Sequence, residues 1–108
     1  MDFFPMTHVQ AEGEVFGERL RELRQKYGVT QQQLSVATGL TEGYISNMER
    51  GQKVPSLTTI LRLALALGCK VTDLVRVFDK SDLQSILPKG VSSMDNLPNP
   101  PPPGRKRR

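Results

Sequence analysis

Residues 28–56 read GVTQQQLSVATGLTEGYISNMERGQKVPS, and this stretch decides the fold. Within it, Thr30 is followed three residues later by Gln33, which is the spacing of a capping box at a helix start. We therefore predict a short helix over residues 31–38. Gly39 ends this helix, because glycine adopts the left-handed conformation of a helix C-terminus at little cost.

A second short helix follows directly, over residues 42–50, with Thr41 as its cap and Gly51 as its end. Two short helices joined by a tight glycine turn form a helix-turn-helix arrangement. In such an arrangement the second helix can enter a DNA major groove while the start of the first faces a phosphate. The apolar residues that we expect to face the core are Leu34, Ala37, Leu40, Ile45 and Met48.

The flanking segments also carry helical signals. Before the motif, Phe16, Leu20, Leu23 and Tyr27 recur at i, i+4, i+7 and i+11, which is one apolar stripe of an amphipathic helix. After the motif, Ser56 caps a fourth helix that extends to residue 67.

The segment after the fourth helix predicts two more short helices. Thr72 caps a fifth helix, and Ser81 with Gln84 forms a second capping box for a final turn or two. Pro88 ends that turn, because the residue before proline avoids the helical region. The sequence thus predicts an all-α fold of five helices with a short extra C-terminal helix.

The chain of 108 residues divides into three parts. Residues 1–14 are an expected N-terminal arm, in which Pro5 and Gly13 interrupt any helix. Residues 15–87 form the folded domain. Residues 88–108 hold six of the eight prolines and predict a disordered, extended tail.

The net charge of +4 equals the charge of the last four residues, 105–108, which are all basic. The remainder of the chain is therefore neutral, and binding to nucleic acid would require a local patch and helix dipoles. The basic tail is a mobile counter-charge for DNA phosphates, a solvated end without function, or a signal for another partner.

Composition excludes several classes of protein. A single cysteine, Cys69, and a single histidine, His8, exclude an internal disulfide and Cys-rich or His-pair metal sites. The longest apolar run, residues 63–67, is too short to cross a bilayer. We expect no metal, no cofactor, no catalytic site and no membrane association, and a cytoplasmic location.

From residue 17 to residue 74 the chain resembles the Cro and phage-repressor type of helix-turn-helix domain, the XRE family. The family implies a five-helix, lambda-repressor-like domain that binds double-stranded DNA, usually as a dimer on a palindromic operator. The residues that carry the resemblance are Arg24, Gly28, Thr30, Gln31, Leu34, Gly39, Tyr44, Ile45, Ser46, Glu49, Arg50, Gly51, Pro55, Ser56, Ala66, Leu67 and Gly68.

The resemblance also implies roles for individual residues. Arg24 and Glu49 match a pair that joins the first helix to the end of the recognition helix. The expected base-reading residues are Glu42, Gly43, Tyr44 and Asn47. The expected phosphate contacts are Thr30, Gln31, Thr41, Arg50, Gln52, Lys53 and Ser56.

Some of these residues have a second interpretation. Glu42 accepts a hydrogen bond from the N4 amino group of cytosine, or its negative charge simply stabilises the helix N-terminus. Asn47 pairs with adenine through two hydrogen bonds or lies on a solvated face. Tyr44 contacts a phosphate or packs over Leu40. Gly43 reads no base directly and shifts recognition toward DNA shape.

Surplus apolar residues predict a dimer interface within residues 71–87. On a helical wheel, where each residue turns by about 100°, the apolar side chains of the fourth helix cover roughly 200° of its circumference. This arc is wider than contact with one core requires. The alternative is that the segment folds back over the core of its own chain. The expected interface residues are Leu74, Val77, Phe78, Leu83, Ile86 and Leu87.

The sequence therefore predicts a DNA-binding transcriptional regulator, a repressor that binds a palindromic operator as a homodimer in the bacterial cytoplasm, at the nucleoid. No small-molecule ligand is expected. The alternatives are a controller protein of a restriction–modification system and an antitoxin that autoregulates its operon and binds a toxin.

Overall fold

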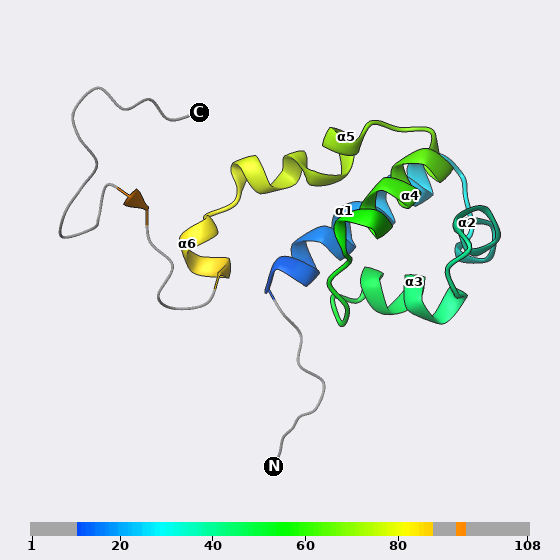
Figure 1. Ribbon diagram of the computed structural model, residues 1–108, viewed down its shortest axis with the longest axis horizontal. Helices are drawn as coiled ribbons and strands as arrows, with labels where there is room; N and C mark the ends of the chain where they lie inside the picture. Colours follow the sequence, from blue (N-terminus) through cyan, green and yellow to red (C-terminus); the bar gives the residue numbers. More distant parts are fainter. Residues whose placement is uncertain (1–10, 88–92, 95–108) are drawn as a thin grey trace, which may run out of the picture.

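The structure, a computed structural model, describes residues 11–87 and 93–94 (Figure 1). Residues 1–10 of the predicted arm at 1–14, and nearly all of the predicted tail at 88–108, lie outside the described residues. Across the described ranges no helix combines the length and the apolar character needed to cross a membrane. The helices are α1 (Ala11–Lys26), α2 (Gln31–Thr38), α3 (Glu42–Glu49), α4 (Leu57–Leu67), α5 (Val71–Val75), the 3₁₀-helix η1 (Arg76–Lys80) and α6 (Leu83–Ile86).

The all-α prediction is confirmed for the described residues. Helix α1 packs against α3, α5 and η1, whereas α2 packs against α3 and α4 (Figure 1). Helix α6 lies beyond η1 at the yellow end of the described chain. The core that joins the first five helices consists of Phe16, Leu20, Leu23, Leu34, Ile45, Met48, Leu63, Ala64, Leu67 and Leu74.

The helix starts of the motif follow the sequence prediction. The Thr30 hydroxyl accepts a hydrogen bond from the Gln33 amide at 3.0 Å, and the Gln33 side chain accepts one from the Thr30 amide at 2.9 Å. The Thr41 hydroxyl caps α3 by accepting from the Tyr44 amide at 3.1 Å. Gly39 adopts a φ of 78°, so the turn between the helices requires glycine's left-handed freedom.

The predicted start of α1 was wrong, because Gly13 lies inside the helix and is buried. An ideal Cβ on Gly13 would lie 2.9 Å from the Gly51 carbonyl oxygen, and one on Gly17 would lie 2.1 Å from the Met48 carbonyl oxygen. Both glycines therefore let α1 approach the end of α3 closely. This contact outweighs the conformational cost of about 1 kcal/mol for a glycine within a helix.

Two predicted caps at the C-terminal end were also wrong. Thr72 lies inside α5, whose start is stabilised instead by the Asp73 carboxylate, which accepts from the Lys70 amide at 2.9 Å. The Ser81 hydroxyl turns back to donate to the Val77 carbonyl at 3.0 Å. Asp82 takes its place and caps α6 by accepting from the Gln84 amide at 3.2 Å.

The positions of Ala37 and Leu74 differ from the prediction. Ala37 is exposed and Thr38 is buried in its place. The Thr38 hydroxyl is satisfied there because it donates to the Leu34 carbonyl at 2.7 Å. Leu74, which we expected in a dimer interface, is fully buried in the core of its own chain, where α5 meets α1 and α4.

Candidate nucleic-acid interface

Helix α3 has a buried side and an open side. Ile45 and Met48 are 0 % exposed and hold the helix on the core. Gly43, Ser46, Asn47 and Arg50 lie three or four residues apart, so they share the opposite face. Because Ile45 and Met48 pack on the core, this opposite face, the open face of α3, is available to a ligand.

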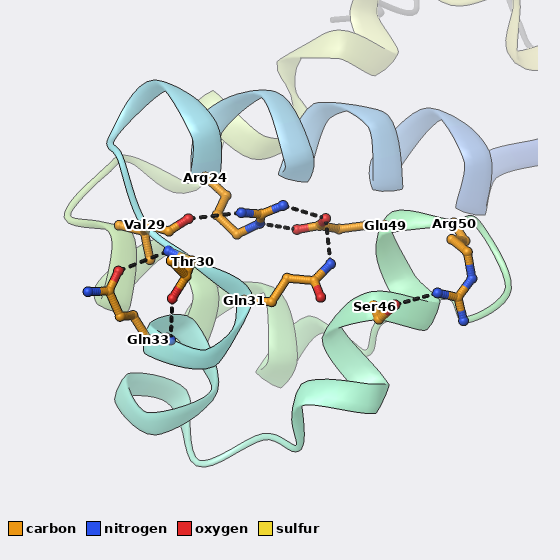
Figure 2. A network of polar contacts seen from close by, with 8 residues as sticks. All are labelled: Arg24, Val29, Thr30, Gln31, Gln33, Ser46, Glu49 and Arg50. Atoms are coloured by element: carbon orange, nitrogen blue, oxygen red, sulfur yellow. Dashed lines mark hydrogen bonds and ion pairs between the residues drawn. The ribbon is translucent and has the colours of Figure 1, made fainter.

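An ion pair between α1 and α3 fixes the orientation of α3 (Figure 2). The Arg24 guanidinium donates from Nε to Glu49 Oε2 at 2.6 Å and from Nη2 to Glu49 Oε1 at 3.0 Å. The side chains of Arg24 and Glu49 are only 12 % and 4 % exposed. Such a paired, nearly buried carboxylate positions the helix strongly, because loss of one partner would strand the other charge away from water.

The start of α2 joins the same network (Figure 2). Gln31 Nε2 donates to Glu49 Oε1 at 3.0 Å, and Arg24 Nη1 donates to the Val29 carbonyl at 2.9 Å. The hydrogen bond to Glu49 raises the pKa of Arg24 above its ordinary value, against the opposing effect of burial. The predicted Arg24–Glu49 pair is confirmed, and it links α1, α2 and α3 into one unit.

Gln31 has a role that the sequence analysis missed. We expected its side chain to contact a phosphate, whereas in the structure its amide is committed to Glu49. The Thr30 hydroxyl satisfies the Gln33 N–H, whereas the N–H groups of residues 31 and 32 have no acceptor within the helix, as at any helix start. The start of α2 therefore remains suited to a phosphate through its backbone.

The other expected phosphate contacts lie at helix starts and in the turn after α3. Thr41 and Ser56 are exposed, and each hydroxyl accepts a hydrogen bond from the backbone of its own helix. Gln52 and Lys53 are exposed in the turn that joins α3 to α4. These positions lie directly before and after α3 in the sequence.

The expected base-reading residues differ in exposure. Glu42 and Gly43 are exposed at the first turn of α3, and Asn47 is half-buried one turn later. Tyr44 is also half-buried and packs against the core, which agrees with its structural interpretation.

Ser46 belongs to the open face but was absent from the predicted set. Its hydroxyl accepts a hydrogen bond from Arg50 Nη1, and Asn47 Oδ1 accepts one from Arg50 Nη2 at 2.5 Å (Figure 2 shows the Ser46 contact). The helical spacing from Gly43 through Ser46 to Arg50 was the available signal.

A short helix anchored on its inner side, preceded by a glycine turn and a capped partner helix, defines a helix-turn-helix domain. Residues 20–74 match the model of the family described as Helix-turn-helix. The chain belongs to this family, in its XRE-type branch of DNA-binding transcriptional regulators.

Relatives and solved structures agree with this assignment. The chain is 32 % identical over 68 residues to an uncharacterized HTH-type transcriptional regulator of Sinorhizobium fredii, covering 63 % of this chain and 88 % of that protein. It is 36 % identical over 59 residues to the immunity repressor of Bacillus phage phi105, covering 55 % of this chain and 41 % of the repressor.

Among solved structures, the restriction–modification controller protein C.AhdI from Aeromonas hydrophila is 44 % identical, with a TM-score of 0.58 and coverage of 59 % of this chain and 97 % of that one. The clp gene regulator ClgR from Corynebacterium glutamicum is 32 % identical, with a TM-score of 0.60 and coverage of 75 % of this chain and all of that one.

Proposed function

We propose that this regulator is a repressor that binds a palindromic DNA operator as a homodimer. The observation that carries the proposal is the open face of α3, held in one orientation by the Arg24–Glu49–Gln31 network. In this proposal α3 reads bases in the major groove through Glu42 and Asn47, and Gly43 between them shifts recognition toward DNA shape. The start of α2 and the turn after α3 hold the phosphates. The phosphate-binding groups are Thr30, Gln31 through its backbone, Thr41, Arg50, Gln52, Lys53 and Ser56.

In this proposal the protein needs no catalytic site, metal, cofactor or small-molecule ligand. It binds DNA in the bacterial cytoplasm. The similarity to a phage immunity repressor supports repression as the direction of control. A repressor of this kind needs only to occupy its operator.

Exposed apolar side chains support the homodimer. Leu57, Leu61 and Leu65 lie at i, i+4 and i+8 on α4 and are 69 %, 48 % and 85 % exposed. In the C-terminal segment, Leu83 is 49 % exposed, whereas Phe78 packs against the core of its own chain. We therefore place the interface on the outer face of α4 and on Val77, Leu83, Ile86 and Leu87, with Leu74 excluded.

Selection of bound sequences from a random DNA pool tests the proposed function. We expect a palindrome whose half-sites lie about one helical turn, ~10 base pairs, apart. A reporter placed behind the selected sequence should lose expression when the protein is produced. Unpaired half-sites, or a reporter that is activated, would contradict the proposal.

Two charge substitutions test the interface. Leu61→Glu and Leu83→Glu should shift the protein from dimer to monomer in sedimentation at micromolar concentration and weaken operator binding. Val36→Glu is the matched control, because Val36 is an 81 % exposed apolar residue on α2, outside the proposed surface. A wild-type protein that sediments as a monomer would contradict the proposed interface.

A controller protein of a restriction–modification system is the second candidate function. The 44 % identity to C.AhdI over nearly all of that chain favours it. Sequencing of the flanking genes separates the candidates, because a controller requires an adjacent methyltransferase and endonuclease.

A further inference from the structure

Arg50 lies on the open face of α3 rather than extending toward the turn that follows. Its guanidinium runs back along the helix and donates from Nη2 to Asn47 Oδ1 at 2.5 Å and from Nη1 to Ser46 Oγ. Glu14 and Glu18 border a hollow of about 610 Å³ beside Arg50. The hydrogen bonds of the guanidinium nevertheless go to the two α3 side chains.

This arrangement changes what α3 presents to a base. A paired contact from asparagine to adenine requires the amide oxygen to accept from N6 while the amide nitrogen donates to N7. Here the oxygen of Asn47 already accepts from a cation. This oxygen keeps a second lone pair, but the donors beside it are more numerous: two N–H groups of the Asn47 amide and those of the Arg50 guanidinium, which carries five donors and no acceptor.

An Asn47–Arg50 pair in which donors outnumber acceptors complements one base edge best. In the major groove guanine offers two acceptors, N7 and O6, whereas adenine and cytosine each place a donor there. The positive charge of Arg50 adds to this preference, because it repels the partial positive charge of an amino group. Arginine paired with guanine through two hydrogen bonds is also the commonest specific contact in protein–DNA complexes.

We propose that Asn47 and Arg50 form one base-reading unit that selects guanine, and that Ser46 is the positioning residue that aligns the guanidinium. The inference rests on the proposed function, in which α3 reads the DNA. It moves Arg50 from the phosphate-binding set to the base-reading set, and it replaces adenine by guanine as the base that Asn47 favours.

The test is selection from a random DNA pool with the wild-type chain and with R50A, S46A and K53A. The wild type should select guanine at one symmetric pair of positions. R50A should reduce the preference for guanine over adenine by about tenfold, within the usual range for a paired contact, and free Asn47 to accept from adenine. S46A should reduce the same preference by a smaller factor.

K53A is the matched control, because Lys53 is an exposed cation in the adjoining turn. It should weaken binding to every sequence by a common factor and flatten the slope of log affinity against log salt by about 0.9. Arg50 is exposed, and thermal melts of R50A should match the wild type.

Three results would overturn the inference. The first is selection of adenine by the wild-type chain, and the second is an R50A variant that loses affinity uniformly, as K53A should. The third is a wild-type chain that selects no sequence at all, which would overturn the DNA-binding function together with the inference and is thereby distinguishable from the first two.

Discussion

Residues 28–56 and residues 69–87 both contain short helices, but different forces hold them. In the first region α2 and α3 each begin at a threonine cap, and Glu49 ties both helices to α1. In the second region α5 has one buried side chain, Leu74, and neither η1 nor α6 has any. The comparison teaches that a polar network fixes the orientation of α3, whereas the C-terminal segment has few buried side chains and leaves apolar surface exposed.

The strongest test of this comparison is Arg24→Ala. The substitution leaves the nearly buried Glu49 carboxylate without its ion pair, so the free energy of unfolding should fall by about 2–4 kcal/mol. A double-mutant cycle with Glu49→Gln in denaturant melts measures the coupling. A coupling energy near zero would show that α3 is not held by this pair.

Exposed Arg21, one turn earlier on α1, is the matched control for Arg24. Arg21→Ala should change the free energy of unfolding by about 0.5 kcal/mol or less, as expected for a surface substitution. The raised pKa of Arg24 means that its charge stabilises the folded state at every pH below the unfolded value and is lost only as pH rises through the higher folded value. The Arg24→Ala loss should therefore be equal at neutral and at mildly alkaline pH.

Two glycines provide the next test: Gly17 lies on α1 and Gly43 lies on α3. Gly17→Ala would place a Cβ 2.1 Å from the Met48 carbonyl oxygen, and should reduce the free energy of unfolding by about 2–3 kcal/mol. Gly43→Ala meets no atom within 4 Å and should raise stability by up to about 1 kcal/mol through helix propensity. Equal effects in thermal melts would mean that the close approach of α1 to α3 is unimportant.

The sequence was informative where local signals and tertiary contacts agree. Thr30, Gly39 and Thr41 were correctly predicted as helix boundaries, because each lies in a turn whose geometry only a few residue types satisfy. The Arg24–Glu49 pair was predictable from the family resemblance. The burial of Ile45 and Met48 followed from their spacing.

The sequence was misleading where a tertiary contact decided the outcome. Gly13 looked like a helix breaker, because a local pattern does not show that the Gly51 carbonyl lies against it. Leu74 looked like surplus apolar surface, because the pattern does not reveal that α5 packs on α1 and α4. The Arg50 contacts with Ser46 and Asn47 depend on side-chain rotamers that no spacing specifies.

The smallest expected effect separates a correctly predicted cap from a wrong one. The Thr30 hydroxyl accepts from the Gln33 amide, so Thr30→Ala should cost about 1 kcal/mol of the free energy of unfolding. Thr72 is exposed inside α5, so Thr72→Ala should change stability by less than about 0.5 kcal/mol, while Asp73→Ala should cost more because the Asp73 carboxylate accepts from the Lys70 amide. Denaturant melts of the three variants decide the order. A larger loss of the free energy of unfolding for Thr72→Ala than for Asp73→Ala would show that Thr72 caps α5, as the sequence predicted. The start of α5 would then resemble the threonine-capped start of α2.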